Sequence, residues 1–217
     1  MAMQMKDTMV RYYDKRSPVY DRVYAYPERQ IELRLLEDQV ATFFAGRNVL
    51  EVAAGTGYWT QFIATQANAV VATDVNQTTL DVLSDRDISG EVRTLVSDAY
   101  DLSGVQGEFD AAFAGCWISH VPIEDQRKWF TRLHAKLAPG ARVFLLDNSS
   151  EQCARLPIVA TDDHGNTYQE RVTDDGATHK VLKNFPTAQA LIDLVGADNM
   201  QFDQLTHYWT FSYRVKE

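Results

Sequence analysis

Cysteine is scarce in this 217-residue sequence, which has only Cys116 and Cys153 and no CxxC motif. Two isolated cysteines exclude a disulfide framework and a zinc site with several cysteine ligands. The sequence also lacks an apolar run long enough to cross a membrane, and its first residues, MAMQMKDTMVRYYDKR, lack the apolar core of a signal peptide. These absences predict a cytoplasmic protein.

Positive charge is in deficit, because 21 Lys and Arg residues stand against 30 Asp and Glu residues and leave a net charge of −9. Such a charge opposes attraction to nucleic acid or to an anionic membrane, although a local basic pocket is compatible with it. No His, Cys, Asp and Glu residues have metal-ligand spacing, and TDDHGN at residues 161–166 is interpreted as a polar loop. We therefore expect a small-molecule ligand and no metal, in a monomer or homodimer.

Apolar residues make up 45% of the chain, enough for one core, and no change in composition marks a boundary, so a single domain over residues 1–217 is expected. From residue 47 onward, short apolar runs alternate with helical patterns, which is typical of βαβ units. The pattern predicts an α/β fold: a doubly wound, mainly parallel, Rossmann-like sheet of seven strands. Four parts are expected in order: a helical cap (1–45), a ligand-binding core (46–150), an insertion with a β-hairpin (151–185), and a closing helix and strands (186–217).

The expected elements follow from periodicity and from turn residues. Strands are expected at Val49–Ala53, Ala69–Asp74, Val92–Ser97, Phe109–Cys116, Arg142–Leu146 and, as one or two strands, Met200–Arg214. Helices are expected at Tyr58–Gln66, Thr78–Asp85, Pro186–Val195 and from Pro122 to a stop at Pro139-Gly140. The DDG sequence ending at Gly176 predicts a hairpin turn between Tyr168–Thr173 and Thr178–Asn184.

The stretch LEVAAGTGYWT runs from a strand-like segment straight into two glycines, Gly55 and Gly57. In a doubly wound sheet, a glycine turn after the first strand lets backbone N–H groups approach a ligand. A dinucleotide-binding loop requires a third Gly or Ala three residues later, where this sequence has Thr60. Glu51, which precedes the loop, would repel a pyrophosphate and attract a cation. The loop thus favours a cationic ligand over a nicotinamide dinucleotide.

Acidic residues close three consecutive strands. Asp74 lies 19 residues after Gly55, near the offset at which a carboxylate meets ribose hydroxyls in nucleoside-binding folds. Asp98 ends the next strand, and Glu51 ends the first. One such residue alone is usually a turn or helix cap, but three beside a glycine loop indicate a nucleoside site.

These residues resemble a known family. The pattern E-x-A-x-G-T-G, with Asp74 after the second strand and Asp98-Ala99 after the third, is similar to that of class I S-adenosylmethionine-dependent methyltransferases. The resemblance covers about residues 49–146. It implies that Gly55 and Gly57 lie under the methionine part of S-adenosylmethionine, with Asp74 at its ribose. The residues expected to bind this cofactor are Tyr13, Glu51, Ala53, Gly55, Gly57, Tyr58, Trp59, Asp74, Val75, Asp98, Ala99, Cys116 and Trp117.

The acceptor is less well defined by the sequence. GTGYWT, CWISHVP and the hairpin resemble small bacterial O-methyltransferases, including a phosphonate O-methyltransferase, in which cap and hairpin residues hold the acceptor's oxyanion. The resemblance implies Arg171 and Lys183 as that basic pair, with Tyr24 or Tyr26 from the cap. Basic residues on an exposed strand can also serve only to keep an edge soluble. A carboxylate acceptor fits equally well.

His120, in WISHVP, is the candidate general base if the acceptor is a neutral hydroxyl or amine, and His179 is second. A buried structural histidine is the competing interpretation. Alternatives at the level of function are S- or N-methylation, cyclisation or elimination of S-adenosylmethionine, a non-catalytic module that binds it, and a nicotinamide-dependent oxidoreductase.

Overall fold

The computed structural model describes residues 2–216 and contains a seven-stranded sheet with strand order β3-β2-β1-β4-β5-β10-β9. Its strands are β1 (Asn48–Val52), β2 (Ala69–Asp74), β3 (Val92–Val96), β4 (Phe109–Gly115), β5 (Leu137–Asn148), β9 (Asp198–Gln204) and β10 (Tyr208–Arg214). Strands β1 to β5 are parallel to their neighbours, whereas β10 runs antiparallel to both β5 and β9. The predicted mainly parallel sheet of seven strands is confirmed.

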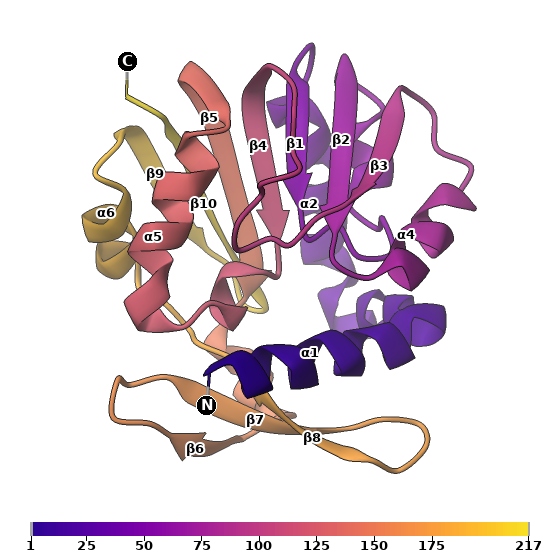
Figure 1. The fold of residues 1–217 in the computed structure, drawn as a ribbon, viewed down its shortest axis with the longest axis vertical. Helices are drawn as coiled ribbons and strands as arrows, with labels where there is room; N and C mark the ends of the chain where they lie inside the picture. The colour runs from indigo at the N-terminus through magenta and orange to yellow at the C-terminus, as the bar shows by residue number, and fades with distance from the viewer. Residues whose placement is uncertain (1, 217) are drawn as a thin grey trace.

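Helices cover both faces of this sheet (Figure 1). One face packs against α2 (Gln30–Phe43), α3 (Thr60–Ile63) and α4 (Gln77–Ser84), and the other against α5 (Ile123–His134) and α6 (Ala188–Val195). Neighbouring residues of a strand point to opposite faces, so that β1 contributes Val49 to the first core and Leu50 to the second. This two-sided burial explains why the strands are nearly continuous apolar runs.

Most predicted bounds differ from the observed ones by one or two residues, and two elements differ by more. Helix α3 has four residues instead of the expected Tyr58–Gln66. Strand β5 already begins at Leu137, so Pro139-Gly140 lies inside a strand and does not end a helix. Leu137 pairs with Phe109 before the register of β4 and β5 shifts, and the backbone of Gly140, at φ +74°, donates to Val215. Sheet pairing at the end of the chain thus overrides the local helix-stop signal.

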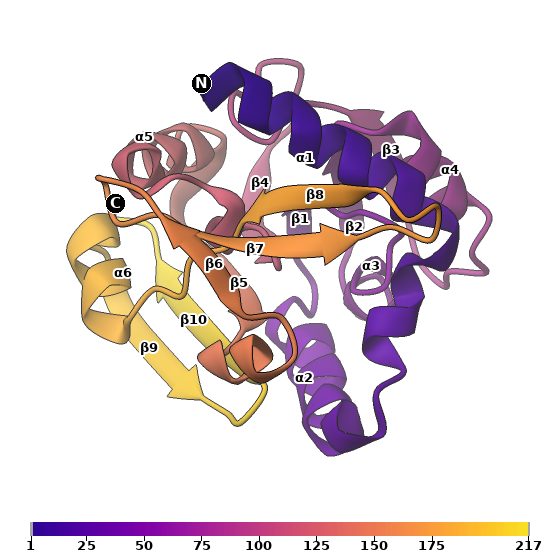
Figure 2. The same cartoon turned by 90° about the horizontal axis from the view of Figure 1, so that it is seen from below.

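A layer of N-terminal and inserted segments covers the carboxyl ends of the parallel strands (Figures 1 and 2). Helix α1 (Ala2–Arg16) crosses this end of the sheet and leads into the 3-10 segments η1 (Ser17–Tyr24) and η2 (Pro27–Arg29). Beneath it lies a separate antiparallel sheet of β6 (Ile158–Thr161), β7 (Thr167–Val172) and β8 (Thr178–Leu182). The predicted hairpin is confirmed as β7–β8, and β6 adds a strand that the sequence pattern did not reveal.

Specific contacts seat this layer on the sheet. Tyr12 of α1 is buried against Tyr168 and Leu182 of the small sheet. Asp21 of η1 accepts a hydrogen bond from Thr56 in the glycine loop at 2.6 Å and forms an ion pair with Arg86. The covering layer is therefore anchored to both the small sheet and the glycine loop. Two further 3-10 segments, η3 (Ile118–His120) and η4 (Ser150–Ala154), follow β4 and β5.

Candidate active site

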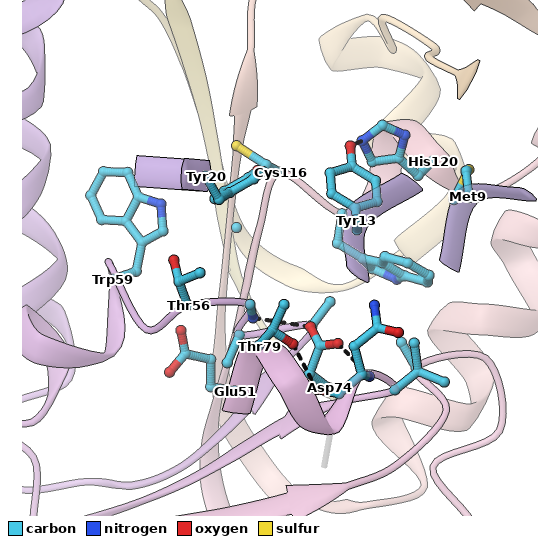
Figure 3. Close-up of a pocket in the computed structure, with 18 of the residues that line it drawn as sticks. Met9, Tyr13, Tyr20, Glu51, Thr56, Trp59, Asp74, Thr79, Cys116 and His120 are labelled. Carbon is cyan, nitrogen blue, oxygen red and sulfur yellow. Dashed lines mark hydrogen bonds between the residues drawn. The ribbon is translucent and has the colours of Figure 1, made fainter. Parts of the chain in front are cut away.

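A cavity lies between the carboxyl ends of β1 to β4 and the covering layer (Figure 3). Glu51 and Asp74 stand on the strand side in this view, and Tyr13, His120 and Met9 stand opposite them. Of the residues predicted to bind a cofactor, those lining the cavity are Tyr13, Glu51, Ala53, Gly55, Trp59, Asp74, Val75, Asp98, Ala99, Cys116 and Trp117. The fold thus brings together residues from four strand ends and from the cap.

The glycine loop requires its two glycines for different reasons. Gly55 has φ +57°, and a Cβ built on it meets nothing within 4 Å, so its bare backbone borders open space in the cavity. Gly57 has φ +81°, and a Cβ there would lie 2.5 Å from Cγ of Leu83. Gly57 therefore permits close packing of α4, and it does not line the cavity.

Tyr58 also points away from the cavity. Its ring stacks on Tyr24 with centroids 3.6 Å apart, and its hydroxyl donates to Glu37 at 2.5 Å. Tyr58 thus supports Tyr24, which does line the cavity. Tyr58 was predicted to bind the cofactor, but in the structure it lies behind the cavity wall and supports Tyr24.

Two non-glycine residues take left-handed backbone angles at neighbouring strand ends. Ala53 follows β1 with φ +55°, and Cys116 follows β4 with φ +54°. Such angles are disfavoured for residues with a Cβ and are concentrated at functional sites. Both residues line the cavity, so two of the four described non-glycine residues with positive φ lie where a ligand would approach.

Glu51 is a buried carboxyl group with an unsatisfied oxygen. Its exposure is 1%, and its Oε2 has no hydrogen-bond partner in the part of the chain that the structure describes. Burial raises its pKa to about 8, an effect that the nearby Thr60 hydroxyl counters only in part. A ligand that brings a positive charge and N–H donors to this oxygen would satisfy it. The S-adenosylmethionine ammonium group has both properties.

Asp74 is held rigidly at the end of β2. Its two carboxylate oxygens accept backbone hydrogen bonds, one from Gly55 at 3.0 Å and the other from Asn76 at 2.8 Å. Burial raises its pKa, while these backbone donors lower it in part. The contact ties β2 to the glycine loop. It also fixes the carboxylate at the cavity wall, where ribose hydroxyls can donate to it.

The end of β3 forms the far wall of the cavity. Asp98 accepts a hydrogen bond from the backbone of Tyr100 at 2.9 Å, and the carbonyl of Ala99 accepts one from the indole of Trp129 at 3.0 Å. Trp117 packs edge-on against Tyr100, and its own indole N–H is buried without a partner among the described residues. This wall combines flat apolar surfaces with polar groups, as a nucleobase site requires.

A second cavity adjoins the first. The two share the side chains of Tyr13, Tyr20, Tyr24, Cys116 and His120, which we call the shared wall. Beyond this wall the charge reverses: the second cavity is lined by the cations Arg16, Arg29, Arg155, Arg171 and Lys183 and by one carboxylate, Asp174. Tyr26, Arg171 and Lys183, which were predicted to bind an acceptor, all line it, and Tyr24 lines both cavities.

A chain of hydrogen bonds crosses the shared wall. The Arg171 guanidinium donates to the Tyr13 hydroxyl at 3.2 Å, and the Tyr13 hydroxyl lies 2.8 Å from Nε2 of His120 (Figure 3). Nδ1 of His120 lies 2.5 Å from the carbonyl of Leu182. Because a carbonyl can only accept, Nδ1 carries the ring proton and Nε2 accepts from Tyr13. His120 thus holds Tyr13 in place.

The titration properties of this chain follow from its burial. Burial, reinforced by the charges of Lys183 and Arg171, lowers the pKa of His120 to about 3, so the ring is neutral at physiological pH. Burial raises the pKa of Tyr13 to about 12, despite the opposing charge of Arg171. At neutral pH the Tyr13 hydroxyl and the His120 imidazole are therefore both uncharged.

Arg171 and Lys183 differ in how their charges are neutralised. Lys183 is 1% exposed, and its ammonium group contacts Asp147 at 2.5 Å and Ser119 at 2.8 Å. Arg171 is 8% exposed and bonds only to neutral groups, Tyr13 and Gln169, while its Nε is buried without a partner among the described residues. Lys183 already has a counter-ion, whereas Arg171 has none within 4 Å among the side chains of residues 8–216.

Sequence reasoning missed several lining residues. Met9 and Val10 reach the first cavity from α1, and Tyr20 belongs to the shared wall. Arg29 and Arg155 reach the second cavity from segments 126 residues apart. The interleaving of tyrosine and arginine in the cap was a signal for Tyr20. No local pattern marks Arg29 or Arg155 as neighbours.

Comparison with known proteins identifies the class. Residues 49–140, from β1 to the start of β5, match the family model described as "Methyltransferase domain". No curated protein sequence matches the chain. Two solved structures of DhpI are similar over nearly the whole of both chains. The complex with SAH is 22% identical, has a TM-score of 0.79 and covers 98% of this chain and 97% of DhpI.

The DhpI complex with SAM and HEP is 21% identical with a TM-score of 0.78, covering 96% of each chain. Magnesium protoporphyrin IX methyltransferase from Synechocystis PCC 6803, with bound SAH, is 10% identical with a TM-score of 0.67, covering 97% of this chain and 100% of that one. The fold is therefore the class I methyltransferase fold. The matched residues 49–140 include the glycine loop, so this part of the chain is similar to a methyltransferase domain. Among residues 2–216, no helix is both long and apolar enough to cross a bilayer.

The buried carboxyl group of Glu51 predicts a specific dependence of stability on pH. Because its pKa is raised in the folded protein, the folded state holds a proton that the unfolded state loses above its usual pKa. Its contribution to the free energy of unfolding is therefore lost as pH rises from about 4.5 to 8. Without ligand, Glu51→Gln should melt a few degrees above the wild type at pH 8 and at nearly the same temperature at pH 5.

Differential scanning fluorimetry at both pH values measures this, with Glu91→Gln on an exposed position as control. Equal differences in melting temperature at pH 5 and pH 8 would contradict the prediction.

Proposed function

We propose that this enzyme transfers the methyl group of S-adenosylmethionine to an oxygen of a small anionic acceptor bound in the second cavity. The observation that carries the proposal is Arg171, a buried guanidinium without a carboxylate partner among the described residues, hydrogen-bonded to a tyrosine of the shared wall. A buried charge that lacks a counter-ion is costly, and a bound anion would remove that cost.

The cofactor would occupy the first cavity. We propose that Glu51 and the backbone at Gly55 hold the methionine part, that Asp74 holds the ribose, and that Asp98 and Ala99 meet the adenine. S-adenosylmethionine supplies an electrophilic methyl group on a positively charged sulfur. The acidic residues of this cavity suit that charge, whereas the arginines beyond the shared wall suit an anion.

An anionic acceptor simplifies the chemistry. An oxyanion attacks the methyl carbon, the bond between carbon and sulfur breaks, and the sulfur keeps the electron pair as a neutral thioether, so no proton is transferred. Residues of this chain then have to align the oxyanion, exclude water and balance charge. Arg171 can donate to the oxyanion, and His120, which accepts the hydrogen bond of the Tyr13 hydroxyl, fixes the position of Tyr13 beside Arg171. No general base is required.

The similarity of this chain to DhpI supports a particular class of oxyanion as the acceptor. DhpI is a phosphonate O-methyltransferase, and its structure with SAM and HEP contains a small phosphonate. Arg171 can bind a tetrahedral phosphonate or a planar carboxylate in a bidentate manner. We therefore propose phosphonates as the first acceptors to test and carboxylates as the second.

The cofactor assignment is tested by calorimetric titration with S-adenosylmethionine, S-adenosylhomocysteine and NAD. We expect both sulfur nucleosides to bind and NAD not to bind. Asp74→Ala should weaken both by roughly ten- to hundred-fold, because a charge-assisted hydrogen bond to the ribose is lost. Asp81→Ala, an exposed residue of α4, is the control. Binding of NAD, or unchanged affinity in Asp74→Ala, would contradict the assignment.

The role of Arg171 is tested with Arg171→Met, which keeps the length of the side chain and removes its charge. We expect kcat/KM for an alkylphosphonate to fall by roughly a hundred-fold or more, because the oxyanion loses its charged partner. The Kd for S-adenosylmethionine should change little. Formation of the methyl ester is followed by mass spectrometry. Arg127→Met, which lies on the exposed side of α5, is the control, and wild-type activity in Arg171→Met would refute the acceptor site.

The role of His120 is tested by the pH dependence of a ratio. With a pKa near 3, His120 stays neutral from pH 5.5 to 8.5, so it cannot titrate in that range. We expect His120→Gln to lower kcat/KM by the same factor at every pH, since the acceptor's own ionisation cancels from the ratio. A factor that grows from pH 5.5 to 7.5 would instead identify His120 as the general base of a neutral acceptor.

A further inference from the structure

A second buried guanidinium lies in the acceptor cavity. Arg29, at the end of η2, is 7% exposed and lies over the rings of Tyr26 and Tyr208, 5.2 and 5.7 Å from their centroids. One of its terminal nitrogens donates to Oδ1 of Asn148 at 3.1 Å. Its Nε is buried without a hydrogen-bond partner among the described residues. The two aromatic rings orient the guanidinium, and its Nε donor is left for a ligand.

The other cations of this cavity are accounted for in different ways. Arg155 forms an ion pair with Glu28 at 2.8 Å, Lys183 forms one with Asp147, and Arg16, which is only half-buried, donates to the Tyr12 hydroxyl. Among the described side chains, those of residues 8–216, neither Arg29 nor Arg171 has a carboxylate within 4 Å. A buried charge without a counter-ion destabilises the free protein. The cavity thus contains two such charges, more than one singly charged acceptor would neutralise.

The two arginines approach the shared wall from different elements. Arg171 is on β7 and contacts Tyr13 and Gln169, whereas Arg29 is in the cap and contacts Asn148 at the end of β5. These neighbours do not overlap. Cys116 of the shared wall is near both groups: its thiol is 3.6 Å from Nδ2 of Asn148, and the charges of both arginines act on it. Both guanidiniums and this thiol line the second cavity.

We propose that Arg29 binds a second acidic group of the acceptor, so that the substrate class is a small bifunctional acid. One oxyanion, beside Arg171 and Tyr13, receives the methyl group. The other stays ionised against Arg29 and sets the orientation of the molecule. This inference rests on the proposed function, because it assumes that the acceptor occupies the second cavity.

Matched pairs of acceptors test the inference. Each pair joins an ω-phosphonocarboxylate (3-phosphonopropionate, 4-phosphonobutyrate or 5-phosphonopentanoate) with the alkylphosphonate of the same chain length, which lacks the second acid. Methyl-ester formation gives kcat/KM for the wild type, Arg29→Met, Arg29→Lys and Arg171→Met. Arg34→Met, an exposed residue of α2 paired with Glu37, is the matched control.

For at least one chain length we expect the wild type to prefer the bifunctional acid by roughly ten-fold or more. Arg29→Met should abolish that preference while changing kcat/KM for the alkylphosphonate by less than about three-fold. Arg29→Lys should restore part of it, and Arg171→Met should impair both members of the pair. An equal loss on both members in Arg29→Met would overturn the inference, as would a wild type without preference at any chain length.

Binding measurements separate this inference from the proposed function. The same probes are titrated calorimetrically into the protein saturated with S-adenosylhomocysteine, which needs no turnover. If no methyl ester forms but the bifunctional probe binds through Arg29, the proposed function fails and the second acid site stands. If methyl esters form and the Arg29 variants change neither binding nor turnover, the proposed function stands and the second acid site fails.

A stability measurement excludes a purely structural role. Because the charge of Arg29 is buried and unpaired, Arg29→Met should melt at or above the wild-type temperature without acceptor. The bifunctional probe should raise the melting temperature of the wild type and not that of the variant. A marked fall in the melting temperature of the ligand-free variant would assign Arg29 to the fold and overturn the inference.

Discussion

The parallel pairing of β1 with β2 and β4 is the constraint on which the site depends. Parallel strands end at the same edge of a sheet, so Glu51, Asp74 and Cys116, which are far apart in the sequence, meet at one cavity. The chain must then change direction within a few residues after β1. Gly55 permits this turn and leaves open space, and the backbone of the same glycine donates to Asp74. The parallel pairing of β1 with β2 and β4 thus determines both the strand order and the position of the cavity.

The covering layer gives this edge a second charge environment. Carboxyl groups dominate the cavity on the side of the strands, and arginines dominate the one beneath the cap and the small sheet. The chain as a whole has a net charge of −9, so the cavity lined mainly by arginines is opposite in sign to the chain. A positively charged donor and a negatively charged acceptor would each meet the complementary charge, with Tyr13 and Cys116 between them.

Unsatisfied buried groups recur throughout the site. Oε2 of Glu51 and the Nε atoms of Arg29 and Arg171 have no hydrogen-bond partner among the described residues, whereas the buried Lys183 in the same region is fully paired. A fold tolerates such groups when a ligand completes them. The contrast distinguishes the residues proposed to contact ligands from Lys183, which joins β8 to the end of β5 and stabilises the layer.

The sequence by itself determined the sheet and most of the residues that line the first cavity. Alternating apolar runs and turn residues are local signals, and strands such as Ala69–Asp74 were predicted at their observed bounds. The acidic strand ends and the glycine loop were also visible, because in parallel sheets such residues always share one edge. The tertiary structure alone decided which residues face the acceptor. Arg29 and Arg171 come from segments 142 residues apart, and only packing of the cap against the small sheet brings them into one cavity. It also decided the chemistry of His120, since burial and the charges of Lys183 and Arg171, which are distant in the sequence, lower its pKa.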